Sequence, residues 1–280
     1  MLISEPSKEI VLTLLRHGAN PNSVGHHVGY AFTYESDYNR NNTLFPLMAV
    51  AKKGRLALVG LLLAARADSN KTNSIGQSAL HVCHPSVSPL GFAILKLLLD
   101  HGGNVNLRDD SGRTPLHCAC ADSSVEVMEL FIEAGAEGNV IDDKGFTELH
   151  LASHSAKDAC RKVTKLMDTF EYEKQVVIEA FETVALTLVQ RGNTEGAFGA
   201  MKWATEMRSV LKIPKTVLDP LECYDFIKEW ETQEELDVYK GSSELLTVQA
   251  VLARERIYTG NFLHLKPLVN FKSTIGESCK

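Results

Sequence analysis

The chain has 280 residues, of which 44% are hydrophobic and 23% are charged, and its formal net charge at pH 7 is -6. This composition is typical of soluble globular proteins and excludes collagen-like and disordered chains. The acidic balance argues against nucleic acid or an anionic membrane as a partner and suits a basic partner better. No stretch approaches the roughly 18–20 consecutive apolar residues of a membrane helix, and the N-terminus lacks the pattern of a secretory signal. We therefore expect a cytoplasmic or nuclear protein.

A repeat of about 33 residues runs through the N-terminal half. Leu47, Leu80, Leu116 and Leu149 lie in equivalent contexts, 33, 36 and 33 residues apart, which is the ankyrin period. The copy GRTPLHCA, at 112–119, fits the T-P-L-H-x-A signature of ankyrin repeats in full. The other copies are GQSALHVC at 76–83, GFTELHLA at 145–152 and the weaker LFPLMAVA at 44–51.

A second pattern flanks each copy in the same register. It is an apolar helix that ends in Gly or Ala and is followed by Asn. We expect the Thr or Ser of each signature to cap the first helix, and Gly to provide a left-handed exit from the second. The leucines should then pack against neighbouring repeats. The four copies are LLRHGANPN at 14–22, LLLAARADSN at 61–70, LLLDHGGNVN at 97–106 and LFIEAGAEGN at 130–139.

Two insertions interrupt this regularity. Residues 23–42 enlarge one finger, and HPSVSPLG at 84–91 lengthens the next repeat by three residues. Insertions in solenoids map to loops on one face, which is often the binding face. A tolerated surface insertion is the favoured explanation.

Longer amphipathic segments replace the repeat from about residue 157. The sequence predicts three helices up to Leu211, with a break at 191–193, and shorter helices at 221–232, 234–241 and 244–260. Small residues in the helical hairpin around 191–193 are typical of tetratricopeptide repeats, although an ordinary helical bundle is the alternative. These residues are Ala185, Gly196, Ala200 and Ala204.

We therefore predict an all-α fold. Residues 1–156 should form an ankyrin-repeat solenoid of about four to five repeats, the first incomplete, and residues 157–280 a truncated region of tetratricopeptide-like helical hairpins.

Three segments of the helical region resemble the feminization (Fem) family of ankyrin proteins. They are VIEAFETVALTLVQRGNTEGAFGAMKWATEMR, CYDFIKEWETQEELDVY and LLTVQAVLARERIYTG, in the order and spacing of that family. The specific part of the likeness lies within 176–260. The closest match is Arg254, Glu255, Arg256 and Ile257, followed by Gly196, Ala197, Trp203, Met207 and Arg208.

The resemblance implies a substrate-recognition subunit of a cullin-2 RING ubiquitin ligase. Members of that family hold the extreme C-terminus of target proteins, often one ending in Arg, and so feed ubiquitin-dependent degradation. This chain departs from the family in beginning inside the repeat array and in ending at NFKSTIGESCK, before the elongin- and cullin-binding segment. Elongin B/C and cullin-2 are therefore expected as partners only of a longer form, whereas a basic C-terminal peptide remains the expected target.

Five aspartates are the candidate peptide-binding residues. Four lie at finger tips, and the fifth should lie near the end of the first helix of the 112–119 repeat. Stacked repeats would place these carboxylates on one concave wall, where they could bind Arg through bidentate hydrogen bonds. Ordinary turn chemistry is the alternative explanation for Asp at these tips. The candidates are Asp109, Asp110, Asp122, Asp142 and Asp143.

Other site chemistries find little support. The six cysteines are scattered, which favours reduced thiols, and His81 and His117 occupy the signature position whose histidine hydrogen-bonds within the repeat. No nucleotide-binding loop or nucleophile elbow occurs, so we expect a non-enzymatic protein without metal or cofactor. A generic ankyrin scaffold or inhibitor, and a metal or redox sensor, remain rival hypotheses. The side chains that suggest a metal site are His81, Cys83, His84, His117, Cys118 and Cys120.

Aromatic and basic side chains of the helical region have two interpretations. Trp203 and Trp230 lie at helical spacing among apolar residues, which favours core packing over anchoring of a peptide. Arg254 and Arg256 could equally form structural ion pairs.

Overall fold

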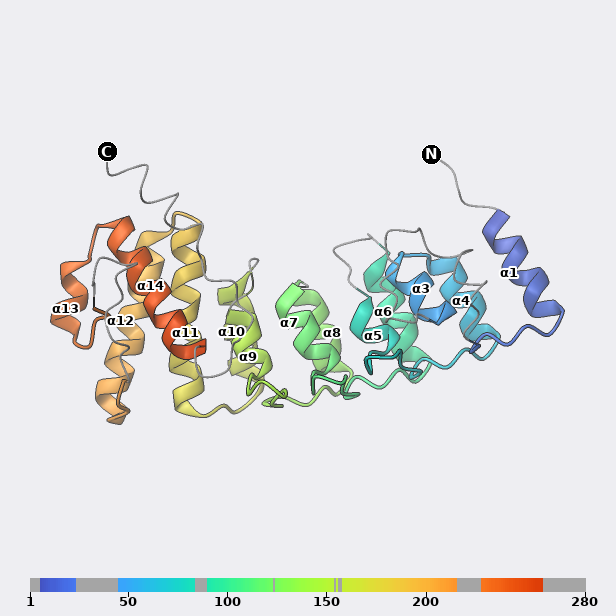
Figure 1. The fold of residues 1–280 in the computed structure, drawn as a ribbon, viewed down its shortest axis with the longest axis horizontal. Helices are drawn as coiled ribbons and strands as arrows, with labels where there is room; N and C mark the ends of the chain where they lie inside the picture. Colours follow the sequence, from blue (N-terminus) through green and yellow to red (C-terminus); the bar gives the residue numbers. More distant parts are fainter. Residues whose placement is uncertain are drawn as a thin grey trace. The chain divides into compact units, whose positions relative to one another are not determined.

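The computed structural model describes residues 6–23, 45–83, 90–122, 124–153, 155, 158–215 and 228–258. All regular elements in these ranges are α-helices, which confirms the predicted all-α fold (Figure 1). The chain forms two compact units, Met1–Asp143 and Lys144–Lys280. The predicted domain boundary after residue 156 stays a prediction. Most of both predicted insertions, at 24–42 and 84–89, lies outside the described residues.

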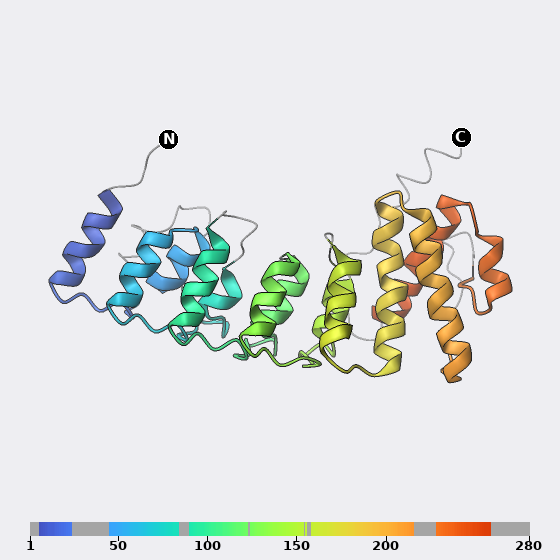
Figure 2. The same ribbon diagram turned by 180° about the vertical axis from the view of Figure 1, so that it is seen from behind.

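The first unit consists of helix pairs at the ankyrin period. Within each pair the two helices pack together, and the loops that follow the second helices run along one edge of the unit (Figures 1 and 2). α1 (Pro6–Arg16) is followed by the pairs α3 (Pro46–Lys52) with α4 (Leu56–Ala64), α5 (Ala79–Val82) with α6 (Gly91–Asp100), and α7 (Pro115–Asp122) with α8 (Val125–Glu133).

Stacking of successive repeats builds the core of this unit. α3 packs on α5 and α5 on α7, while α1 packs on α4 and α4 on α6. The repeating leucines Leu47, Leu80 and Leu116 are all buried. A single repeat could not cover these side chains alone, so the 33-residue period of leucines reflects a core shared between neighbours.

The second helix of a repeat exits through a left-handed residue, as predicted. Gly18, Gly102 and Gly135 have φ angles of 83°, 80° and 85°. After α4 the equivalent residue is Arg66, whose φ is 62°. This backbone region is costly for a residue that has a Cβ atom, so the exit after α4 carries some strain.

An asparagine ladder ties successive repeats together. In the first three of the four apolar helix motifs that end in Asn, this Asn donates from Nδ2 to a carbonyl oxygen after the second helix of the next repeat and accepts there from a backbone N–H on Oδ1. The Nδ2 bonds join Asn22 to Arg66, Asn70 to Gly102 and Asn106 to Gly135, at 3.2, 2.8 and 3.0 Å. The Oδ1 atoms accept from Asp68, Asn104 and Glu137, at 2.8, 2.6 and 2.9 Å.

We expect Asn106→Ala to lower the free energy of unfolding by about 1–2 kcal/mol, because two hydrogen bonds between repeats are lost. Urea unfolding followed by circular dichroism measures this difference. Asn106→Asp is the matched control, since it keeps the acceptor and removes only the donor, and it should cost about half as much. Equal losses for the two variants would contradict a role for both bonds.

The second unit contains α9 (Glu148–Ser153), α10 (Ala159–Thr169), α11 (Lys174–Gln190), α12 (Thr194–Leu211), α13 (Gln233–Val238) and α14 (Ser243–Tyr258). α9 packs on α10 and α11, and α11 packs on α12 and α14. The three helices predicted up to Leu211 are confirmed, with α11 and α12 forming a hairpin around 191–193. No helix in the described ranges is long and apolar enough to cross a membrane.

The helix predicted at 221–232 is wrong at its C-terminal end. Residues 221–227 lie outside the described residues, and 228–232 are not helical. Thr232 instead caps α13, because its side chain accepts from the N–H of Glu235 while Glu235 accepts from the N–H of Thr232. This capping box starts a new helix at Gln233, and the predicted helix at 234–241 ends at Val238.

Small residues allow close packing of the α11–α12 hairpin. Ala185, Ala200 and Ala204 are buried, and α11 packs against α12. Gly196 has a different role from the one predicted. A Cβ atom there would lie 2.7 Å from the side chain of Asn193, which caps α12 by accepting from the N–H of Gly196. Gly196 thus makes room for the helix cap.

Candidate functional site

The buried side chain of Asp109 stabilises the turn at the tip of the finger that precedes the 112–119 signature. Asp109 Oδ1 accepts from the backbone N–H groups two and four residues later, both at 2.9 Å. Asn73 does the same one repeat earlier, at 3.1 and 2.8 Å. Because a neutral amide serves equally at this position, the position requires an acceptor for the turn and not a negative charge.

An arginine of the same repeat already binds this carboxylate. Arg113 donates from Nη2 and Nε to Asp109 Oδ2, at 3.0 and 3.2 Å. Burial alone would raise the pKa of Asp109, but the backbone N–H groups and Arg113 outweigh it and lower the pKa below its ordinary value. The pKa of Arg113 is raised although burial opposes this, and the charges of Asp109 and Asp142 contribute to the rise.

The other candidate aspartates divide by exposure. Asp142 occupies the position of Asp109 one repeat later and is also buried. Asp110 and Asp143 follow these residues and are exposed. Their backbone N–H groups donate to carbonyl oxygens of the preceding finger, at 3.1 and 3.0 Å, so the two carboxylates lie on adjacent fingers.

Asp122 lies apart from the finger tips. It is exposed and is the last residue of α7, so the length of that helix separates it from the fingers by about 10 Å. Cys118 lies on α7 between the finger tips and Asp122, and the carboxylates on both sides affect the pKa of its thiol. Burial raises the pKa of its thiol to about 11, and the charges of Asp109 and Asp122 add to this rise. The peptide-binding role of the five aspartates stays a prediction, with Asp110, Asp122 and Asp143 its exposed members.

The signature histidines hydrogen-bond within their own repeat, as predicted, and they also reach the next finger. His117 Nδ1 accepts from the N–H of Thr114 at 3.2 Å and lies 2.9 Å from its hydroxyl oxygen. Since Nδ1 accepts, Nε2 carries the proton and donates to the carbonyl oxygen of Val140 at 3.0 Å. His81 makes the equivalent contact to the carbonyl oxygen of Arg113 at 3.1 Å.

The side chains that suggested a metal site do not form one in the described part of the chain. No group of three His, Cys, Asp or Glu residues there could hold a metal ion, and His84 lies outside the described residues. Cys83 is buried, and burial raises the pKa of its thiol to about 12. In this environment the thiol is therefore protonated at neutral pH.

The last signature histidine has a different partner. His150 Nδ1 accepts from the N–H of Thr147 at 3.2 Å, as in the other repeats. Its Nε2 lies 3.8 Å from a carboxylate oxygen of Glu179 on α11. A side chain of α11 thus lies nearest to this ring nitrogen among the contacts described, and no pattern in the sequence indicates it.

A buried network of charges joins the helices of the second unit. Glu182 on α11 accepts from Nε and Nη2 of Arg208 on α12, both at 3.1 Å, and from Arg256 on α14 at 2.5 Å. Burial would raise the pKa of Glu182, but the charges of Arg256 and Arg208 lower it below its ordinary value. Arg256 is an ion-pair former, as one of the two interpretations predicted.

A second carboxylate extends the network to the loop before α13. Glu229 accepts from Arg256 Nε at 3.0 Å and from Lys215 Nζ at 2.9 Å. Lys215 Nζ also donates to the carbonyl oxygen of Trp230 at 2.6 Å and lies 3.3 Å from the centre of its ring. Burial lowers the pKa of Lys215 to about 8, although Glu229 and Glu182 oppose this change.

Both tryptophans pack inside the second unit. Trp230 is 1% exposed, and its Nε1 donates to Thr205 Oγ1 at 2.7 Å. Trp203 is partly buried and lies against Phe181, with 4.3 Å between ring centres. Core packing, the favoured interpretation of these residues, is confirmed for Trp230.

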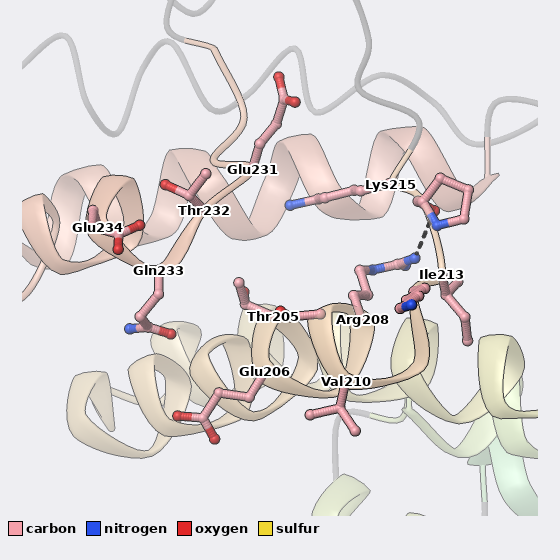
Figure 3. A pocket seen from close by; sticks show the side chains of 13 residues that line it. Thr205, Glu206, Arg208, Val210, Ile213, Lys215, Glu231, Thr232, Gln233 and Glu234 are labelled. Atoms are coloured by element: carbon pink, nitrogen blue, oxygen red, sulfur yellow. Dashed lines mark hydrogen bonds between the residues drawn. The ribbon is translucent and has the colours of Figure 1, made fainter.

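A cleft of about 720 Å³ opens beside this network. It lies between the C-terminal part of α12, residues 213–215 and residues 231–234 (Figure 3). Lys215 points into the space between α12 and residues 231–234, and Arg208 points from α12 toward Pro214, to whose carbonyl oxygen it donates at 3.2 Å (Figure 3). Sequence reasoning did not find this cleft.

Comparison with known proteins agrees with the repeat geometry. The family of ankyrin repeats in three copies (Ank_2) matches residues 84–169. Stacked fingers, signature histidines and this match together show that this part of the chain consists of ankyrin repeats.

Curated relatives share only part of this chain. Protein phosphatase 1 regulatory subunit 27 of Mus musculus is 36% identical over 76 residues, which is 27% of this chain and 48% of the relative. The Homo sapiens protein of the same name is 34% identical with the same coverage. RelA-associated inhibitor of Mus musculus is 34% identical over 88 residues, 31% of this chain and 10% of the relative. The chain thus spans about half the length of the first two relatives.

Proposed function

We propose that this protein is a non-catalytic receptor of the cytoplasm or nucleus that binds a basic segment of a partner protein on its ankyrin fingers. The observation that carries the proposal is the pair of exposed carboxylates, Asp110 and Asp143, on adjacent fingers. An arginine side chain binds such carboxylates through charge-assisted hydrogen bonds. The net charge of -6 also favours a basic partner.

We expect Asp110→Asn with Asp143→Asn to weaken binding of a basic peptide by on the order of tenfold, because hydrogen bonds to charged groups contribute more than neutral ones. Fluorescence anisotropy with labelled peptides measures this, using free C-termini that end in Arg or in a neutral residue. The matched control is Glu133→Gln with Glu137→Gln, which removes the same charge from exposed positions of the same unit. Equal weakening by the two pairs would contradict a specific finger site.

The finer form of the proposal is the substrate-recognition part of a cullin-RING ubiquitin ligase that binds C-terminal degrons. The resemblance of residues 176–260 to the Fem family supports it. The match to ankyrin repeats covers residues 84–169, so it provides no information on the segment that resembles the Fem family. A degron reader should lose its peptide when the terminal carboxylate is amidated. Copurification of a longer form with elongin B/C and cullin-2 would support the ligase role, and amidation-insensitive binding would contradict degron reading.

The second candidate is an ankyrin scaffold or inhibitor without a ligase role. Its support is the names of the relatives, a regulatory subunit and an inhibitor. A scaffold should bind a folded partner surface and should ignore free C-terminal peptides. Binding to the folded domain of a partner, undiminished by an excess of such peptides, would therefore favour this candidate.

A further inference from the structure

The buried network of the second unit is unbalanced in charge when Lys215 is protonated. Counted over the described residues, it contains three cations, Arg208, Arg256 and Lys215, and two carboxylates, Glu182 and Glu229. All five side chains are at most 6% exposed. Burying an unbalanced charge costs free energy. Loss of a proton from Lys215, or its movement out of the network, would leave two cations facing two carboxylates.

The other ion pairs of the network do not need Lys215. Glu182 binds both Arg208 and Arg256, and Glu229 also accepts from Arg256 Nε at 3.0 Å. Each carboxylate therefore keeps a guanidinium partner if the lysine moves away.

The position of Lys215 in the structure suits a neutral amine. Its Nζ donates to two oxygen atoms, Glu229 Oε1 at 2.9 Å and the carbonyl oxygen of Trp230 at 2.6 Å. A neutral amine has two N–H groups, so both hydrogen bonds can form without the additional proton. Burial lowers the pKa of Lys215 to about 8, and Arg256 acts in the same direction, whereas Glu229 and Glu182 oppose the change.

Two further charged groups of the neighbouring helices act around Lys215. Arg208 of α12 shares the carboxylate of Glu182 with the lysine, and Glu235 of α13 attracts the ammonium group. Their effects oppose each other, so burial stays the dominant influence on the proton of Lys215.

The cleft offers the protonated side chain a solvated position. Lys215 lines the cleft and points into the space between α12 and residues 231–234 (Figure 3). The exposed charges around this space largely cancel, because two of its three exposed carboxylates pair with surface lysines and the third is offset by Lys212. Hydration of the ammonium group is therefore what the lysine gains there. The three carboxylates are Glu206, Glu231 and Glu234.

We propose that Lys215 is a proton-sensitive strap between residues 213–215 and the loop before α13. In its neutral form it lies inward on Glu229 and Trp230, which is the position in the structure. In its protonated form it also populates an outward position in the cleft and uncovers the ring of Trp230. None of these residues is a finger carboxylate, so the failure of this proposal and the failure of the proposed function are distinguishable.

The direction of the pH dependence follows from the two positions. The inward lysine has a pKa of about 8, whereas an exposed lysine has the ordinary value of 10.5. Raising the pH therefore favours the inward form, and the ratio of inward to outward forms should rise by on the order of tenfold between about pH 7 and pH 9.

Trp230 provides a reporter because its ring centre lies 3.3 Å from Lys215 Nζ and its side chain is 1% exposed. The experiment uses the full chain with Trp203→Phe, which leaves one tryptophan. Quenching of its fluorescence by acrylamide is measured between about pH 6.5 and pH 9.5. We expect quenching at low pH and progressive protection as the pH rises. Emission that changes with pH while quenching does not would show that Lys215 titrates in place, and it would overturn the strap.

Variants assign the effect to Lys215. Lys215→Met carries no charge and leaves a balanced network, so it should fold and its quenching should not depend on pH. Lys215→Arg keeps its charge throughout this range and should also lose the pH dependence. Lys212→Met is the matched control, since Lys212 is exposed and lines the same cleft. Persistence of the pH dependence in Lys215→Met would overturn the proposal.

Urea unfolding checks the sign independently. The pKa of Lys215 is lower in the folded protein than the ordinary value of 10.5, so the unfolded chain binds the proton more readily between about pH 8 and pH 10.5. The ratio of folded to unfolded protein should therefore rise with pH in this window, relative to Lys215→Met measured in the same buffers. A constant difference between the two proteins across the window would contradict a buried lysine that releases its proton.

Discussion

Glu182→Gln is expected to lower the free energy of unfolding by about 3–5 kcal/mol, because it breaks a buried ion pair by removing one partner. The carboxylate of Glu182 is 1% exposed and binds both Arg208 and Arg256. The amide that replaces it has no charge, so two buried guanidinium groups lose their shared counter-ion. Equilibrium unfolding in urea, monitored by circular dichroism, measures the loss.

Glu206→Gln is the matched control, since Glu206 is 56% exposed and forms only a surface pair on α12. It should change the free energy of unfolding by less than about 1 kcal/mol. A loss for Glu182→Gln no larger than that of the control would refute a stabilising role of the network.

The contribution of Glu182 should also depend on pH. Its pKa in the folded protein lies below the ordinary value of 4.5, so the unfolded chain binds a proton more readily. The stabilisation is therefore present above pH 4.5 and is lost as the pH falls through the folded pKa. In Glu182→Gln this part of the acid sensitivity should be missing.

Asp109→Ala is expected to lower the free energy of unfolding by about 2–3 kcal/mol, because two backbone N–H groups and Arg113 lose their acceptor. Asp110→Ala, one residue later and exposed, should cost less than about 0.5 kcal/mol. Thermal and urea unfolding of the pair separates a loop-building aspartate from one available to a partner.

Peptide binding provides the complementary measurement for this pair. Asp110→Ala should weaken binding of a basic peptide while the fold stays intact. Asp109→Asn, which retains the acceptor oxygen that Asn73 uses in its own finger, should preserve most of the stability. A large loss of binding in Asp109→Asn with unchanged stability would show that the buried carboxylate contacts the partner after all.

The ankyrin half of the fold could be predicted because each repeated residue has one structural role. The leucines form the shared core, the glycines exit the helices, and the terminal asparagines form the ladder. The alignment of Asp109 with Asn73 also indicated that Asp109 has a role in the turn. A position that can be occupied by either Asn or Asp does not depend on a negative charge.

The buried network could not be predicted from the sequence. Glu182 and Arg256 are 74 residues apart, and each lies in a predicted helix. In such a sequence pattern a charged residue is normally assigned to the solvent-exposed face of the helix. Only the packing of α11 against α14 brings them together. Arg256 and Arg208 also belong to the residues that carry the Fem resemblance, so part of that likeness concerns side chains that hold the helices together.

The arginine already bound in the finger has a kinetic consequence for any partner. Arg113 is tethered four residues from Asp109, so it returns to that carboxylate at an effective concentration that a free peptide in the cell does not reach. A partner arginine that sought Asp109 would have to compete with this internal ligand at every encounter. Asp110 and Asp143 are exposed and lie outside this pair, so a partner arginine need not displace Arg113 there, and association should be correspondingly faster.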